Sequence, residues 1–169
     1  YQAAQNATSG SSNLAIGVCA LRSSVMSRNN IAIGKEALLS FVGSTFGQSY
    51  THSDNIAIGN ESLKSNIQGS NNVAVGHCTL RFNTGAQNST LGHMAAYRFS
   101  GGNSVFIGYR SGFCTQSGYG NTIVGAAAYN YGQGGSRNSV LGYGALVGVG
   151  YNSEITGDGN TALGYQSGE

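Results

Sequence analysis

The chain has 169 residues, which is enough for one domain with one core. Only 8% of its residues are charged, and its net charge of +2 comes from eight basic and six acidic residues. That charge is too small and too scattered for a nucleic-acid-binding surface, and no apolar run approaches the ~20 residues of a membrane-spanning helix.

A short phrase recurs along the whole chain and defines the predicted elements. It consists of Asn, a variable residue, a small or β-branched residue, an aliphatic residue and Gly. In chain order the copies are NLAIG ending at Gly17, NIAIG at Gly34 and Gly59, NVAVG at Gly76, NSTLG at Gly92, the longer NSVFIG at Gly108, NTIVG at Gly125, NSVLG at Gly142 and NTALG at Gly164. Successive glycines are 17, 25, 17, 16, 16, 17, 17 and 22 residues apart. Hydrophobic residues, 40% of the chain, thus recur at regular spacing, which argues against disorder.

Each phrase alternates with the period of two that is typical of a strand. We expect Ile33 and its equivalents before each Gly to point inward as an apolar column. Small residues such as Ala32 then face outward, where another surface can approach. The half-phrase after each Gly, such as KEAL, is expected to form a second short strand through Ala37 and Leu38. Helical repeats need over 30 residues, so the chain is predicted to be all-β: a parallel β-solenoid with coils of ~16–17 residues, stacked ~4.8 Å apart.

The repeated Asn and Gly are expected to form a structural corner in every coil. Gly permits positive φ or close backbone approach, and stacked Asn side chains can bond to one another as a ladder. The expected corner residues are Asn13, Gly17, Asn30, Gly34, Asn55, Gly59, Asn72, Gly76, Asn88, Gly92, Asn103, Gly108, Asn121, Gly125, Asn138, Gly142, Asn160 and Gly164.

Residues 1–169 are expected to form a single repeat domain. The two longer intervals are interpreted as loop insertions over residues 44–54 and 148–159. YQAAQ at Tyr1 and YQSGE at Tyr165 stand at the same phase of the repeat, without a capping segment. This phase predicts a segment of a longer array, or ends that are covered by another subunit. A coil this thin buries little apolar area, so its remaining faces are expected to pack against sister chains.

The phrases NIAIG, NVAVG and NSVLG resemble the head repeats of trimeric autotransporter adhesins, and NTALGYQSG and NSVFIGYRSG resemble repeat arrays of phage and virus tail fibres. The resemblance spans essentially the whole chain. It implies a homotrimer, intertwined or side by side, that is extracellular, at a cell surface or on a virion tail fibre. There it would attach to a host receptor or glycan. The adhesin heads have a shorter coil, which leaves handedness and cross-section open.

Few residues suggest chemistry. Glu36 and Glu61 are at equivalent positions of neighbouring coils, but Lys35 and Lys64 stand nearby, so they are interpreted as a solvated face rather than a glycosidase pair. The single cysteines, Cys19, Cys78 and Cys114, have no metal-site spacing and are interpreted mainly as small buried hydrophobes. We therefore expect no enzymatic activity and no cofactor.

His77 and His93 follow the repeat Gly in consecutive coils and should stack ~5 Å apart. They are weak candidates for a metal site. Aromatic side chains are better candidates for ligand or receptor contact, although they could equally fill the coil or a chain interface. The proposed contact residues are Tyr50, His52, Tyr109, Tyr143, Tyr151 and Tyr165, and a second cluster is expected from Tyr97, Phe113 and Tyr129.

Three functions are weighed from these observations. The first is a rigid structural fibre for adhesion or receptor binding, with no nucleic-acid partner and no membrane insertion. The second is a self-polymerising extracellular filament whose uncapped ends stack on one another. The third, a carbohydrate-active β-helix enzyme, is disfavoured because the chain lacks a cluster of acidic residues.

Overall fold

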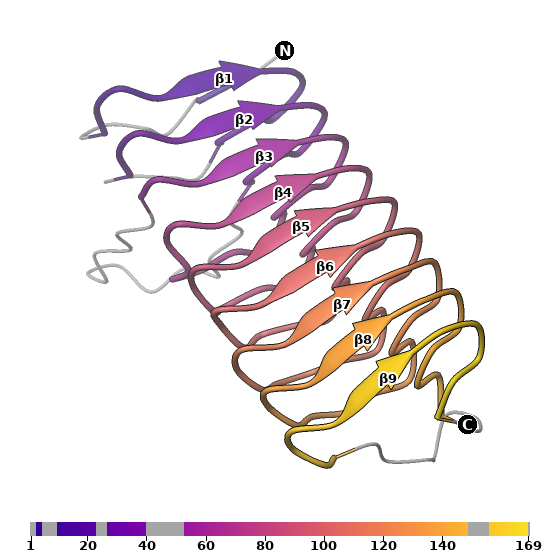
Figure 1. Ribbon diagram of the computed structural model, residues 1–169. Helices are drawn as coiled ribbons and strands as arrows, with labels where there is room; N and C mark the ends of the chain where they lie inside the picture. The colour runs from indigo at the N-terminus through magenta and orange to yellow at the C-terminus, as the bar shows by residue number, and fades with distance from the viewer. Residues whose placement is uncertain (1–2, 5–9, 23–26, 40–52, 149–155, 169) are drawn as a thin grey trace.

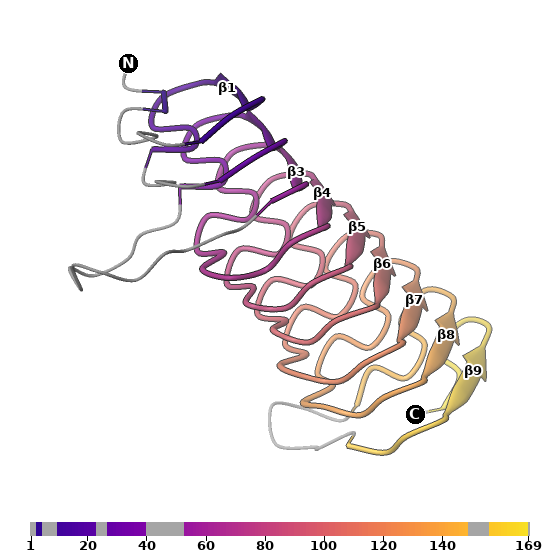
Figure 2. The same cartoon turned by 90° about the vertical axis from the view of Figure 1, so that its left-hand side faces the viewer.

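A computed structural model describes residues 3–4, 10–22, 27–39, 53–148 and 156–168. Within them the chain forms nine three-residue strands, which pair in parallel and in sequence order in one sheet (Figure 1). The strands are β1 (Leu14–Ile16), β2 (Ile31–Ile33), β3 (Ile56–Ile58), β4 (Val73–Val75), β5 (Ser89–Leu91), β6 (Val105–Ile107), β7 (Thr122–Val124), β8 (Ser139–Leu141) and β9 (Thr161–Leu163). Each strand begins a new coil, and the coils stack along one axis as a β-solenoid (Figure 2). The predicted all-β solenoid is therefore confirmed. The insertions predicted over 44–54 and 148–159 lie largely outside the described residues.

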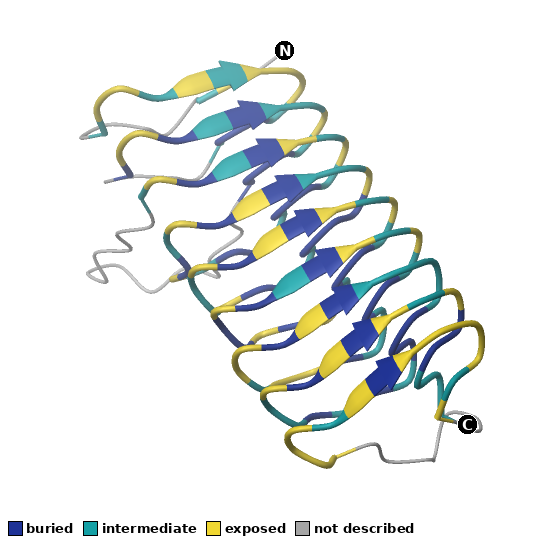
Figure 3. Ribbon diagram, in the orientation of Figure 1, coloured by how far each residue is buried: buried dark blue, intermediate teal, exposed yellow. Residues whose placement is uncertain are grey.

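The sheet faces the opposite way from the sequence prediction. The middle residue of each strand is the inward one: Ala32, Ala57 and Ala74 are fully buried. The flanking residues are exposed or half-buried, as the colours of Figure 3 show, and Ile33 is half-buried. The expected inward column before each Gly is therefore wrong. The coil interior is too narrow for two rows of large side chains, and Leu38 and its equivalents already fill it from the opposite wall.

The half-phrase after each Gly is a stacked turn rather than the predicted second strand. Its second and fourth residues have positive φ in coil after coil, for example 58° at Glu36 and 48° at Leu38. The two backbone N–H groups therefore point in opposite directions along the axis. Glu36 donates to Val18 O in the preceding coil, and Leu38 donates to Ser62 O in the following one. Neighbouring coils thus bond on this wall as well, without a β-strand.

An asparagine ladder joins the coils at the corner before each strand. The Oδ1 atom of Asn55 accepts hydrogen bonds from both the backbone N–H and the side-chain amide of Asn72, at 3.0 and 3.2 Å. The remaining amide proton of Asn72 goes to Gly85 O at 3.0 Å. The same backbone-to-Oδ1 bond links Asn30 to Asn13, Asn55 to Asn30, Asn88 to Asn72, Asn138 to Asn121 and Asn160 to Asn138. These six bonds, at buried or partly buried corners, would be costly to leave unmade.

Asn103 is not part of this ladder, which corrects one of the predicted corners. Its place is taken by Ser104, whose backbone N–H donates to Asn88 Oδ1 and whose Oγ accepts from Asn121 N. Asn103 lies one position earlier, exposed, at φ 53°, equivalent to Asn71 and Gln87. The apparently longer phrase NSVFIG is therefore an ordinary five-residue phrase that begins at Ser104.

The repeat glycines turn each strand into the stacked turn, and their backbones nearly touch. Gly34 has φ 132°, and a Cβ added there would lie 2.6 Å from atoms of Gly59 in the next coil. Both predicted reasons for Gly, positive φ and close approach, thus apply at once. A second glycine column stands three residues before the ladder, where a Cβ on Gly85 would meet Gly101 O.

The core keeps its volume although its residues change along the axis. In the β2, β3 and β4 coils a central Ala faces a Leu four residues after the repeat Gly. In the β6 coil Phe106 replaces the Ala, and Gly112 replaces the Leu. A Cβ on Gly112 would lie 2.3 Å from Phe106 Cε1, so the ring occupies the space of the missing side chain. Phe99 packs on the same ring, with centroids 4.8 Å apart.

This exchange predicts a compensating pair of substitutions. Gly112→Leu should lower the free energy of unfolding by about 1–3 kcal/mol through overpacking, and Phe106→Ala by about 3–5 kcal/mol through a cavity. The double variant recreates the Ala–Leu pair of other coils and should recover most of both losses. Chemical denaturation of the four proteins measures the coupling. If the losses of the two single variants simply add in the double variant, the inferred exchange between Phe106 and Gly112 is wrong.

The ladder predicts a contrast between two asparagines. Asn72→Ala leaves the Asn88 N–H without its partner, at about 1–3 kcal/mol, and Asn55 Oδ1 keeps only the backbone donor of residue 72. Asn103→Ser is the matched control and should change stability by less than about 0.5 kcal/mol, because Ser12 occupies the same place in its own coil. Equal losses in the two variants would show that the ladder register is wrong.

Candidate functional site

Three of the aromatic residues predicted for ligand contact lie in one column, directly after the repeat Gly. Tyr109, Tyr143 and Tyr165 are 53%, 57% and 72% exposed. The predicted contact residues Tyr50, His52 and Tyr151 lie outside the described residues.

The column is stacked in two runs. The rings of His77 and His93 are 5.0 Å apart, as the coil spacing predicts, and His93 stacks on Tyr109 at 5.5 Å. Tyr143 stacks on Tyr165 at 5.6 Å. Ala126 separates the runs. Among the described residues, no group of three or more His, Cys, Asp or Glu side chains is placed to hold a metal ion. The column is therefore an aromatic surface strip.

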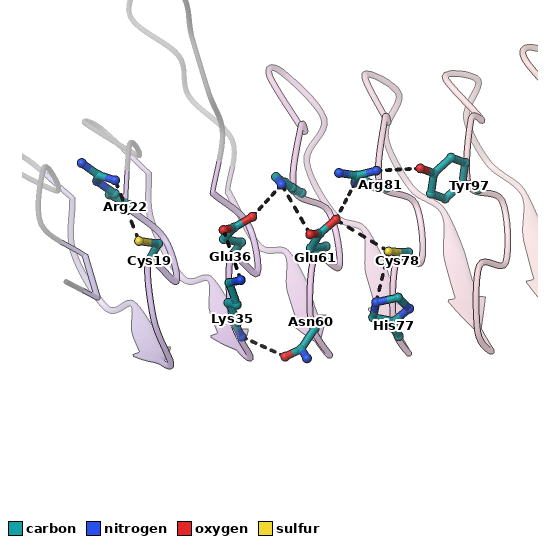
Figure 4. Close-up of polar contacts among 11 residues, drawn as sticks. Cys19, Arg22, Lys35, Glu36, Asn60, Glu61, His77, Cys78, Arg81 and Tyr97 are labelled. Carbon is teal, nitrogen blue, oxygen red and sulfur yellow. Dashed lines mark hydrogen bonds and ion pairs between the residues drawn. The ribbon is translucent and has the colours of Figure 1, made fainter. Parts of the chain in front are cut away.

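A charged network runs beside this strip across neighbouring coils (Figure 4). Lys64 Nζ lies 2.6 Å from Glu36 and 3.5 Å from Glu61, and Arg81 Nε lies 2.8 Å from Glu61. Arg81 also donates to Tyr97 Oη at 2.6 Å. The hydrogen bond from Lys64 lowers the pKa of Glu36. The two glutamates are thus neutralised by lysine and arginine, which fits a structural face rather than an acid–base pair.

The cysteines do not form a reactive site. Cys78 is buried, while Cys19 and Cys114 are only half-buried, and all three are free thiols. Cys78 Sγ lies 3.5 Å from His77 Nε2 and 3.8 Å from Glu61. Burial, followed by the negative charge of Glu61, raises the pKa of the Cys78 thiol. The thiolate that a nucleophile requires is therefore disfavoured there.

A second aromatic row lies further round the coil. Tyr97 stacks on Phe113 at 5.1 Å, and Phe82 meets Tyr97 edge to face at 5.3 Å. Tyr129, expected in this cluster, is instead fully buried in the core, where its hydroxyl donates to Gly134 O. It stands four residues after the repeat Gly, one position earlier than Tyr97 and Phe113, and that position faces inward.

Arginines accompany this row. The guanidinium of Arg81 lies 5.0 Å from the centre of the Phe82 ring, and that of Arg110 lies 4.2 Å from Phe113. Phe82, Arg98 and Arg110 were not identified from the sequence. Phe82 and Arg98 share one position, six residues after the repeat Gly, in consecutive coils. A further signal was the long stretch without acidic residues in which the two arginines stand.

The outer face of the sheet is an exposed apolar surface. Two columns of mostly aliphatic residues flank the buried middle column, and many of their members are strongly exposed: Leu14 46%, Ile16 53%, Ile58 37%, Val73 37%, Leu91 52%, Ile107 38%, Leu141 51% and Leu163 71%. Near β7, β8 and β9 this face forms a groove of about 320 Å³, lined among others by Val124, Leu141 and Leu163. A continuous apolar face of this kind is typical of a protein interface.

Comparisons with protein-family models, curated proteins and solved structures found no match to this chain. The described residues contain no helix that is long and apolar enough to cross a membrane.

The charged network predicts a dependence of stability on pH. Because the pKa of Glu36 is lowered from 4.5, the stabilisation is present above pH 4.5 and is lost as the pH falls through the lowered value. The pKa of Lys64 is raised from 10.5, so its contribution persists below that pH and is lost only above it. Thermal melts between pH 6 and pH 3 should show a smaller loss in Lys64→Gln than in the wild type, by up to about 1 kcal/mol. Parallel pH profiles for the two proteins would contradict this assignment.

Proposed function

We propose that the chain is a building unit of a rigid homotrimeric fibre used for attachment at an extracellular, cell-surface or virion location. The observation that carries this proposal is the exposed apolar face of the parallel sheet. Soluble monomers rarely leave a contiguous apolar surface of this extent in water. A second copy of the same chain offers the same columns at the same axial spacing, so it can cover the face coil by coil.

The way the columns are built supports a cyclic assembly. The outward residue before each Gly is aliphatic in every coil, from Ile16 to Leu163. Rotation about an axis parallel to the coil stack brings equivalent columns together at every level, and the contact closes without leaving an edge. Three copies are the number that the resemblance to adhesin heads and tail fibres implies.

The surfaces away from the sheet then carry attachment. The exposed Tyr109, Tyr143 and Tyr165 present flat amphipathic rings at regular intervals along the fibre axis. We assign no catalytic role: the carboxylates described on this face are neutralised by Lys64 and Arg81.

The assembly can be tested by measuring mass in solution. Light scattering should give three times the chain mass of 17.3 kDa. Ile107→Glu places a charge on the covered face and should dissociate the assembly or lower its melting temperature by several degrees, because burying an unpaired carboxylate costs several kcal/mol. Thr84→Glu adds the same charge at an exposed site away from the sheet and should change neither quantity. A stable wild-type monomer would contradict the proposal, and concentration-dependent polymers would favour the filament instead.

A further inference from the structure

The charges of this chain are unevenly distributed. Its six acidic residues are Glu36, Asp54, Glu61, Glu154, Asp158 and Glu169, so residues 62–153 contain none, although five basic residues lie there. Lys64 and Arg81 pair with the glutamates at the start of the stretch, and Arg137 lies 3.6 Å from Asp158. Among the described residues, Arg98 and Arg110 have no carboxylate partner. Two positive charges are thus left uncompensated in the middle coils.

One of these arginines, Arg98, borders an open groove next to the second aromatic row. The groove has a volume of about 410 Å³ and is lined by Phe82, Arg98, Ser100 and Gln116. Phe82 is 45% exposed, and Arg98, Ser100 and Gln116 are exposed as well. The Phe82 ring contacts both Tyr97 and the guanidinium of Arg81, and these contacts restrict its orientation. A volume of this size is in the usual range for small-ligand sites.

The lining specifies a ligand with three features. The Phe82 ring offers a flat apolar surface, which suits the C–H face of a pyranose. Ser100 and Gln116 supply a hydroxyl and an amide for sugar hydroxyls, and Ser100 Oγ keeps its acceptor lone pairs because it donates to Gln116 O at 2.6 Å. The planar guanidinium of Arg98 suits a carboxylate, to which it can donate two parallel hydrogen bonds.

Other polyanions fit less well. A nucleic acid is bound through several neutralised phosphates, whereas the lining of this groove offers a single cation, Arg98. A peptide is usually held by a strand edge or an apolar groove. None of the four lining residues lies in a strand, and only one of them is apolar.

We propose that this groove binds an acidic saccharide, with a sugar ring on Phe82 and its carboxylate on Arg98. This proposal adds a ligand class to the proposed attachment fibre. It rests on that proposed function only because the groove must lie outside the interface between the chains. It does not involve the sheet face. In a fibre of three chains the groove is present three times, which adds avidity toward a polymeric acidic glycan.

Calorimetric titration of the full chain in its native assembly tests the site. The probes are trigalacturonic acid, its carboxyl-reduced counterpart and a triglutamate peptide. The wild type should bind the uronate at least about tenfold more tightly than either of the others, as expected when a charge-assisted bidentate contact is lost. Arg98→Gln and Phe82→Ala should each weaken uronate binding by a similar factor. Arg137→Gln removes another exposed positive charge in the same stretch and should leave binding unchanged.

Several results would overturn the site: no uronate binding by the wild type, equal binding of the reduced sugar or the peptide, or an equal loss in Arg137→Gln. Arg98→Gln alters an exposed residue, so an unchanged melting temperature separates lost binding from misfolding even if Phe82→Ala is unstable. Measuring mass on the same samples separates the two proposals. A trimer that does not bind contradicts the groove alone, and a monomer that binds contradicts the fibre alone.

Discussion

Stacking in register is the constraint on which the rest of this structure depends. Each coil lies on the next at ~4.8 Å, so every residue is covered by its own equivalent. A position can therefore hold only side chains that tolerate a copy of themselves above and below. Asn is well suited, because one amide group can accept from the next copy and donate to the preceding one, as Asn55 accepts from Asn72 and donates to Asn30. Gly is required where backbones approach too closely for any Cβ, as at Gly34.

The same constraint explains the composition. A charged column would place like charges a few ångströms apart, so the chain keeps charged residues rare and mixes their signs where they occur. Lys64 lies between Glu36 and Glu61, and Arg81 continues the alternation. Large core side chains must likewise be balanced within a coil, as Phe106 is by Gly112. Deviations from the repeat are thus compensated locally, and the coil outline is preserved.

The period, the parallel stacking and the corner glycines could be predicted from sequence because they repeat in every copy. The direction of the strand could not, since alternation separates two faces without saying which is inside. The usual rule that larger apolar residues face inward failed here because Leu38 and its equivalents fill the narrow interior from the other wall. The Phe106–Gly112 pair indicated which face is inside, because the large residue in the middle of the strand coincides with a missing side chain four residues after the repeat Gly. Asn103 was misassigned because Ser104, which replaces Asn in the ladder, breaks the letter pattern but keeps the hydrogen bonds.

The candidate sites were harder to predict for a related reason. The exposed tyrosine column repeats and was found, but the groove at Phe82 and Arg98 is lined by different residue types from three consecutive coils, which only the fold brings together. The proposed fibre depends most on sister chains covering the outer face of the sheet. An experimental structure of the assembled protein tests this directly. It should show Ile16, Ile107 and Leu163 in van der Waals contact with another copy along the whole stack, whereas the same side chains surrounded by solvent would contradict the account.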